Sequence, residues 1–360
     1  NMKNIIKLTF VMLSSFALIG SANAGDLTVG GTAKATYSIQ SSDSTTGANN
    51  AGKNIGIANE LTFTATGELD NGFTWKYQIE HDDTAAGTFV ATDDSRLEIT
   101  TGYGTIGLYN TEGSLSTKYG SSQGAYAPAS DYGLGGSIQY GGNIDGFNNI
   151  QYHTPADMLP FGAVVRLGYA PDMNDTAQLS NKESNSAPGS QATGRSLQMA
   201  NITLSPMDGL SIGGDVAATQ DETGTSGSNG TEQGVSANLG AKYTMGPVSI
   251  GYVEGGYQPA VASGELTYYE NKFMGIQFDV NDAVSVSYNV DESNKNARAA
   301  VADGASAGSK TETEMEQKSI QLAYTTGGAT IGIAQVEVDN ADYTAGKTET
   351  QSVISLAISF

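Results

Sequence analysis

The side chains that most often carry out catalysis or bind metals are scarce in this chain. It contains two histidines, His81 and His153, and no cysteine. The histidines lie far apart in the sequence, without the short spacing of paired zinc ligands or the pattern of a nucleophile with its base. We therefore predict no metal site, no cofactor and no enzymatic activity.

The charged residues point to a different kind of surface. Acidic residues number 38 against 17 basic ones, which gives a formal net charge of −21. This excess disfavours nucleic acid and anionic membrane surfaces as partners. Two acid pairs, Asp82-Asp83 and Asp93-Asp94, bracket one polar segment. They could bind a divalent cation weakly, but we favour the interpretation that they are solvated charges.

Most of the chain after residue 24 alternates apolar and polar residues, the pattern of a strand whose two faces meet different environments. Between Leu27 and Ile39 the odd-numbered residues are apolar or small, and the even-numbered residues are polar or glycine. The C-terminal segment alternates from Val353 and ends on the aromatic Phe360. Such segments are roughly 8–12 residues long, enough to cross a hydrocarbon layer as tilted strands.

The connections between these segments alternate in length. Short connections are expected near 70–72, 101–104, 156–160, 206–209, 246–247, 280–283 and 327–328. Long polar connections are expected near 41–56, 82–93, 111–146, 172–194, 222–232, 258–264, 294–315 and 339–348. These fifteen connections predict an all-β antiparallel barrel of about sixteen strands. The alternation changes phase at Ala200-Asn201 and Ala334-Gln335, which we interpret as β-bulges.

A soluble β-sandwich or barrel would show the same alternation with its apolar face turned inward. Two features favour an outward apolar face. The polar faces are rich in Thr, Ser, Gly and isolated charges, which suits a wet interior. Aromatic residues such as Trp75 and Tyr243 lie toward segment ends, as in the interfacial girdles of membrane barrels.

Residues 1–24 have the pattern of a targeting segment. Lys3 and Lys7 precede a mostly apolar stretch from Leu8 to Ile19, and Ala22-Asn23-Ala24 is a typical cleavage site. We predict a signal peptide, export, and a barrel domain over 25–360. An uncleaved N-terminal anchor is the alternative.

The sixteen segments, the targeting segment and the terminal Phe360 together resemble the general, trimeric porins of Gram-negative bacteria. Short stretches are also similar to that family: 30–34, 95–97 followed by 102–108, and 149–155. The resemblance implies an outer-membrane barrel with short periplasmic turns and long external loops, surrounded by lipid and lipopolysaccharide. It also implies a homotrimer, passive passage of ions and small hydrophilic solutes, and recognition of Phe360 by the barrel assembly machinery.

In that family the third long loop, here about 111–146, folds into the barrel and narrows it. The resemblance implies that loop acids face a basic cluster on the wall: Glu112, Asp131 and Asp145 against Lys34, Lys76 and Arg96. The alternation independently places the three basic residues inward, since a lipid-facing charge at mid-membrane costs roughly 2–4 kcal/mol. The acids could instead be ordinary solvated loop residues. The loop lacks the Pro-Glu-Phe-Gly element of some family members.

The function that follows is a diffusion pore with a modest preference for cations, because the acidic excess must lie mostly in loops. Three alternatives stay open. The first is a barrel that does not conduct, and the second is a soluble, β-rich surface or adhesive protein. The third is a barrel enzyme, which would need a Ser/His or Asp/His group on one rim.

Overall fold

The computed structural model describes residues 25–43, 51–82, 94–117, 138–171, 173, 195–221, 233–259, 266–298 and 310–360. Sixteen strands lie within these ranges: β1 (Asp26–Asp43), β2 (Gly52–Glu68), β3 (Thr74–Asp82), β4 (Ser95–Thr101), β5 (Gly104–Asn110), β6 (Asn149–His153), β7 (Val164–Ala170), β8 (Arg195–Met207), β9 (Leu210–Asp221), β10 (Val235–Met245), β11 (Val248–Gln258), β12 (Leu266–Asn281), β13 (Val284–Arg298), β14 (Lys310–Thr326), β15 (Ala329–Asp339) and β16 (Thr348–Ser359). The predicted all-β antiparallel barrel of sixteen strands is confirmed.

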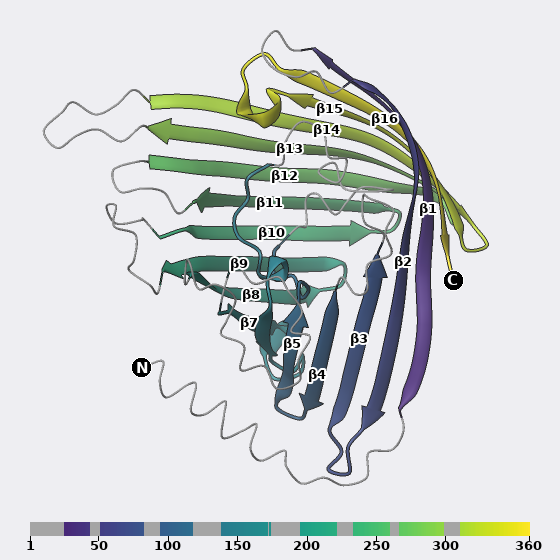
Figure 1. Cartoon of the computed structure of the whole chain (residues 1–360), viewed down its shortest axis with the longest axis vertical. Helices are drawn as coiled ribbons and strands as arrows, with labels where there is room; N and C mark the ends of the chain where they lie inside the picture. The colour runs from purple at the N-terminus through teal and green to yellow at the C-terminus, as the bar shows by residue number, and fades with distance from the viewer. Residues whose placement is uncertain are drawn as a thin grey trace, which may run out of the picture.

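Each strand pairs with its neighbours in the sequence, and β1 pairs with β16, so that the sheet closes on itself (Figure 1). The closing seam runs from Thr32 opposite Ser359 to Asp43 opposite Thr348. A closed ladder satisfies the backbone groups of every strand internally, which a hydrocarbon environment requires. Closure also removes the exposed edge that would invite aggregation.

The connections alternate in length as the sequence indicated. At one end of the barrel β4 and β5 are joined through 102–103, β8 and β9 through 208–209, and β10 and β11 through 246–247. At the other end three of the long connections, those expected over 41–56, 294–315 and 339–348, are shorter than expected. The one predicted over 294–315 is confined to 299–309, because β13 and β14 continue as alternating polar strands.

The outer face of the barrel carries a broad apolar band, with charged residues such as Lys272 and Glu337 toward the long-loop end, and the inner face is mostly polar, the reverse of a soluble barrel. On β16, Ile354, Leu356 and Ile358 point outward and are 43–53% exposed, whereas Ser355 between them is 3% exposed. The register carries the same inside–outside division around the sheet. An apolar exterior is the surface that surrounding hydrocarbon stabilises.

The two predicted bulges are wrong. The register is continuous through Ala200-Asn201 and Ala334-Gln335, and irregularities occur instead near Leu204–Met207 and Asp279–Asn281. The alternation changes phase at Ala200-Asn201 and Ala334-Gln335 because the apolar side chains on the long-loop side of these positions face inward. These inward side chains include Leu197, Met199, Val336 and Val338, all buried against segments inside the barrel.

The described parts of the connections contain three short 3-10 helices: η3 (Ile144–Gly146), η4 (Pro160–Gly162) and η5 (Ala341–Tyr343). Of these, η3 ends the third loop and η5 lies between β15 and β16. Among the described residues, no helix is long and apolar enough to cross a membrane.

Candidate functional site

The described parts of the third loop, 111–117 and 138–146, lie against the inner wall of the barrel. Leu115 and Ile144 are 2% and 0% exposed, and they pack with Leu197 and other inward residues of the wall. A glycine on the inner face of β7 makes room for them. A Cβ atom on Gly168 would lie 2.5 Å from Ile144 Cδ1 and 3.0 Å from Leu115 Cδ1. The loop is therefore seated by apolar packing in an otherwise polar interior.

The outgoing limb of this loop is held by polar side chains of the wall. The amide of Thr117 donates to Asp215 Oδ2 on β9 at 2.6 Å. On β6, Gln151 Nε2 donates to the carbonyl of Gly113 at 2.5 Å. Gly113 has a φ of +86°, and a Cβ there would lie 2.5 Å from Gln151 Nε2. The position therefore suits glycine for both its backbone angle and its close contact.

The returning limb, 138–142, runs across the inner face of the wall, from β12, β14 and β15 at Ile138 to β8 at Gly142 (Figure 1). Ile138 is buried against an apolar cluster that includes Phe273 and Val336. Asn271 Nδ2 donates to the carbonyl of Gln139 at 3.0 Å, and the amide of Gln139 donates to the hydroxyl of Tyr343 at 3.0 Å. Tyr343 belongs to the connection between β15 and β16, here called the eighth loop (340–347), so the two loops contact each other inside the barrel.

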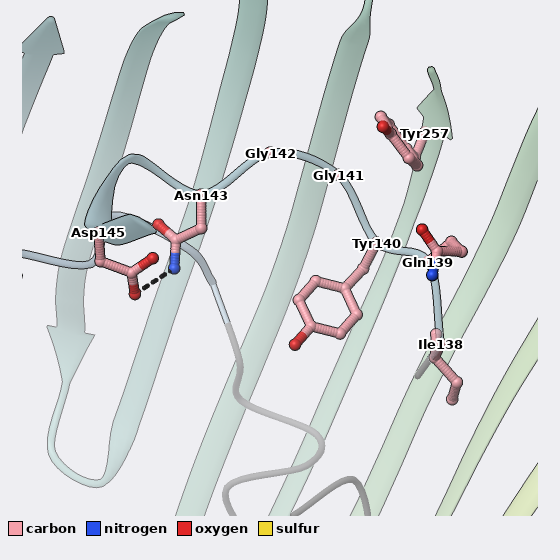
Figure 2. Close-up of a pocket in the computed structure, with 8 residues that line it drawn as sticks. All are labelled: Ile138, Gln139, Tyr140, Gly141, Gly142, Asn143, Asp145 and Tyr257. Atoms are coloured by element: carbon pink, nitrogen blue, oxygen red, sulfur yellow. Dashed lines mark hydrogen bonds between the residues drawn. The ribbon is translucent and has the colours of Figure 1, made fainter. Parts of the chain in front are cut away.

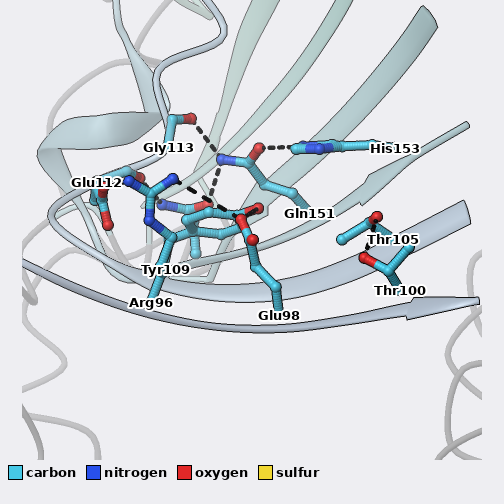
Figure 3. Close-up of polar contacts among 10 residues, drawn as sticks. Arg96, Glu98, Thr100, Thr105, Tyr109, Glu112, Gly113, Gln151 and His153 are labelled. Carbon is cyan, nitrogen blue, oxygen red and sulfur yellow. Dashed lines mark hydrogen bonds and ion pairs between the residues drawn. The ribbon is translucent and has the colours of Figure 1, made fainter. Parts of the chain in front are cut away.

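The predicted pairing of a wall base with a loop acid is present at one point. Arg96 on β4 forms an ion pair with Glu112 at the start of the third loop (Figure 3). Nη1 of Arg96 also lies 3.9 Å from Oε1 of Glu98. Tyr109 on β5 donates its hydroxyl to Glu98 Oε1 at 2.8 Å. Because Arg96 and Glu112 are in direct contact, this pair neutralises its charges locally, with no open gap between them.

Burial sets the protonation behaviour of Glu112. Removal from water raises the pKa of this carboxyl group, and the nearby charges of Arg96 and Lys76 only partly lower it again. Lys76 therefore belongs to the same electrostatic neighbourhood. It lies on the inner face of β3, opposite Thr66 on β2 and Glu98 on β4.

Lys34 is separate from this group. It faces inward on β1 but pairs with Ala58, whereas Lys76 pairs with Thr66 on the same strand, β2. Eight residues of strand separate the two positions, about 26 Å at the usual rise. The described members of the predicted site, which exclude Asp131, therefore do not form a single cluster.

Of the two remaining predicted loop acids, the structure describes Asp145 and leaves Asp131 out. Asp145 lies in η3 on the returning limb, where Asn143 Nδ2 donates to its Oδ2 at 2.6 Å. It borders a lumenal cavity with Tyr257 of β11 (Figure 2). Asp131 lies outside the described residues. The assignment of these acids and bases to a pore constriction stays a prediction.

The histidines have ordinary packing roles. His153 stacks on Tyr109 with ring centroids 6.3 Å apart, and its Nε2 lies 2.8 Å from Gln151 Oε1. His81 meets Phe63 edge to face at 5.7 Å. Within the described ranges there is no group of three or more His, Cys, Asp or Glu side chains that could hold a metal ion.

Sequence reasoning missed the residues that hold the two loops, chiefly Gln151, Asp215 and Tyr343. It also missed the inward apolar side chains that seat them. The two phase changes in the alternation were the available signal, because at each the apolar residues switch between the inward and the outward face. A bulge and an inward apolar patch give the same sequence pattern.

No protein-family profile and no curated protein matches the chain. Solved structures do match. OmpT of Vibrio cholerae, in its trimer form, superposes with a TM-score of 0.65 at 13% identity, covering 94% of this chain and 100% of its own. An anion-selective porin from Comamonas acidovorans gives 0.61 at 13% identity (93% and 100%). The outer-membrane channel DcaP of Acinetobacter baumannii gives 0.62 at 11% identity (94% and 98%). The chain therefore has the closed, sixteen-stranded fold of the porins.

Proposed function

We propose that this protein is an outer-membrane porin, a passive diffusion channel for ions and small hydrophilic solutes. One observation carries the proposal: a closed barrel with an apolar exterior and a mostly polar interior holds its third loop against the inner wall. Such a barrel suits a hydrocarbon layer outside and water inside. Its fold likeness to porins and to an outer-membrane channel supports the same function.

The proposed route to the membrane begins with the signal peptide, 1–24, which lies outside the described residues. Export would place the short turns in the periplasm and the long loops outside the cell, in contact with lipid and lipopolysaccharide. We propose that the barrel assembly machinery recognises the C-terminal strand with Phe360. The ring is 67% exposed, on the same outward face as Ile358, so it is accessible to such a partner.

We propose that the third loop narrows the pore, with a modest preference for cations. Both of its described limbs lie inside the barrel, and Asp145 borders the lumenal cavity. Arg96 is compensated by Glu112, which leaves less positive charge at this part of the wall. The net charge of −21 then favours cations in the wider pore.

A homotrimer is the proposed assembly. The outward face of β1 carries the small residues Gly31, Ala33 and Ala35, which would allow close contact between barrels. Beside them on β2, Ile55 and Ile57 are 79% and 66% exposed, as expected for apolar residues that a neighbour covers. The loop proposed to latch onto a neighbour, 82–93, lies almost wholly outside the described residues. Native mass measurement in mild detergent tests this, and monomers alone would contradict it.

The deciding experiment for the channel is reconstitution in planar bilayers. Folded protein, identified by its heat-dependent migration on a gel, should give stepwise increases in conductance. The same preparation, boiled, should give none. Folded, membrane-inserted protein that never conducts would favour a non-conducting barrel. Protein that remains soluble without detergent would favour the surface-protein alternative.

A further inference from the structure

A cavity of about 410 Å³ lies inside the barrel on the returning limb of the third loop. Its wall is formed by 138–143, by Asp145 and by Tyr257 of β11 (Figure 2). Its volume is within the range of sites that bind small organic molecules. A solute in the lumen would meet it beside the loop that we propose narrows the pore.

Aromatic rings gather around this cavity. Tyr257 stacks on Tyr269 with centroids 5.8 Å apart and an interplanar angle of 17°. Tyr269 in turn contacts Tyr343 at 5.3 Å, and Tyr140 meets Phe273 edge to face at 6.1 Å. Contacts with these neighbours fix the two rings that border the cavity, Tyr140 and Tyr257.

One of these aromatic rings already contacts an ammonium group. Lys295 Nζ lies 5.7 Å from the centroid of the Tyr343 ring, within the range of a cation–π contact. In the cavity itself, Asp145 is the one acidic residue among the described residues of the wall, which include no basic residue. Asn143 donates a hydrogen bond to its carboxylate and so orients it.

We propose that this cavity binds organic cations that carry an aromatic ring, such as arylalkyl ammonium ions. The ammonium group would lie near Asp145 and against a tyrosine ring, and the aromatic part would pack on Tyr140 or Tyr257. Hydroxyl or amide groups on the solute could bond to Gln139 or Asn143. The inference names a solute class for the proposed channel, and it rests on that function for the route by which solutes arrive.

Two measurements with benzyltrimethylammonium test the binding site and the channel function independently. The first is block of single-channel potassium current, with tetramethylammonium (no ring), benzyl alcohol (no charge) and maltose (a neutral sugar) as comparison probes. The second is calorimetric titration of folded protein in detergent, which needs no conduction. We expect benzyltrimethylammonium to bind and block more strongly than the other three. Binding without conduction would overturn the channel and leave the site, whereas conduction with neither binding nor block would overturn the site.

Variants locate the site. Asp145→Asn keeps the shape of the side chain and should weaken binding about fivefold through the lost charge. Tyr257→Leu should weaken it about threefold, and Tyr257→Phe should restore it, because the ring face supplies the attraction. Glu60→Gln, an acid on the inner face of β2, and Tyr103→Leu, in a short turn, are the matched controls.

Binding that is unchanged in both Asp145→Asn and Tyr257→Leu would overturn the assignment, as would equal weakening in the Glu60→Gln control. Maltose binding as strongly as the cation would show a saccharide site instead. Each variant is first checked for heat-dependent migration. If Tyr257→Leu does not fold, the comparison of Asp145→Asn with Glu60→Gln decides.

Discussion

Phe360 and Gly31 form a reciprocal pair of backbone hydrogen bonds at the end of the seam between β1 and β16 that closes the barrel. The amide of Gly31 donates to the carbonyl of Phe360 at 2.9 Å, and the amide of Phe360 donates to the carbonyl of Gly31 at 3.1 Å. A Cβ on Gly31 would lie 3.1 Å from Phe360 Cζ and 2.5 Å from the carbonyl oxygen of Glu60. The terminal residue thus contributes both to the seam and to the outward surface.

Deletion of Phe360 should lower the yield of folded barrel more than it alters the pore. The deletion removes two backbone bonds, each contributing about 0.5–1.5 kcal/mol, together with an outward ring that does not face the lumen. Phe360→Ala keeps the bonds and removes the ring, so its yield should be intermediate. Heat-dependent gel migration gives the yield, and the molecules that fold should conduct like the wild type. Wild-type yield after deletion would contradict this.

The barrel itself was predictable because alternation reports directly on which face a residue occupies. The outward run Ile354, Leu356, Ile358 and the tight-turn signal Asp70-Asn71-Gly72 are both local properties. The strand count followed from them and is confirmed. The signal peptide, the trimer and the cation preference are not tested by the fold and stay predictions.

The interior was less predictable, because its contacts join residues far apart in sequence. Thr117 and Asp215 are 98 residues apart, and Gln139 and Tyr343 are 204 apart. Nothing in the local pattern connects such pairs. The resemblance groups Lys34 with Arg96, and the alternation does not correct this, because it gives the face of a residue but not its height along the barrel.

Gly113→Ala should loosen the start of the third loop and alter the conductance. Its positive φ strains any residue with a side chain, and the added methyl group would crowd Gln151 and Tyr109. We expect noisier open-channel current with little loss of folded protein. Gly146→Ala is the matched control, since a Cβ there meets nothing within 4 Å. Identical current noise in the two variants would contradict the role of Gly113.

Tyr343→Phe tests whether the eighth loop holds the third. The hydroxyl of Tyr343 accepts from the amide of Gln139 at 3.0 Å and lies 2.7 Å from Ser293 Oγ. Removing it leaves the ring contact with Tyr269 but frees the returning limb at a cost of about 1–3 kcal/mol. Faster proteolysis of the third loop should follow. Tyr324→Phe, on the outer face of β14, should leave the rate unchanged, and an equal effect in both variants would argue against the contact.

Cation preference should fall as the pH is lowered toward the pKa of Glu112. Burial raises the pKa of this carboxyl group, so protonation begins at a higher pH than for an exposed glutamate. The neutral acid no longer compensates Arg96, and the lumen gains positive charge. Reversal potentials across a potassium chloride gradient, measured from pH 7 to about 4, check this. Glu112→Gln should start with a lower cation preference and lack this step, and an identical pH profile would count against the role of Glu112.

Cation preference should also weaken as salt rises. The inner wall is close to balanced, since inward acids such as Glu60, Glu98, Asp215 and Asp291 stand against Lys34, Lys76, Arg96, Arg166 and Lys242. The net charge of −21 must then act mostly from loops and strand ends. Its reach is about 8 Å at 0.15 M salt and about 3 Å at 1 M.

The basic residues of the wall are poorly placed to reverse this preference. Arg96 is paired with Glu112, and Lys34 is offset from Lys76 by eight residues of strand. The described part of the wall therefore holds no dense positive cluster that would oppose the negative charge of the loops. The reversal potential should show a preference for potassium over chloride at about 0.1 M salt, and this preference should nearly vanish at about 1 M. A chloride preference at low salt would show that Lys34, Lys76 and Arg96 control the narrowest point after all.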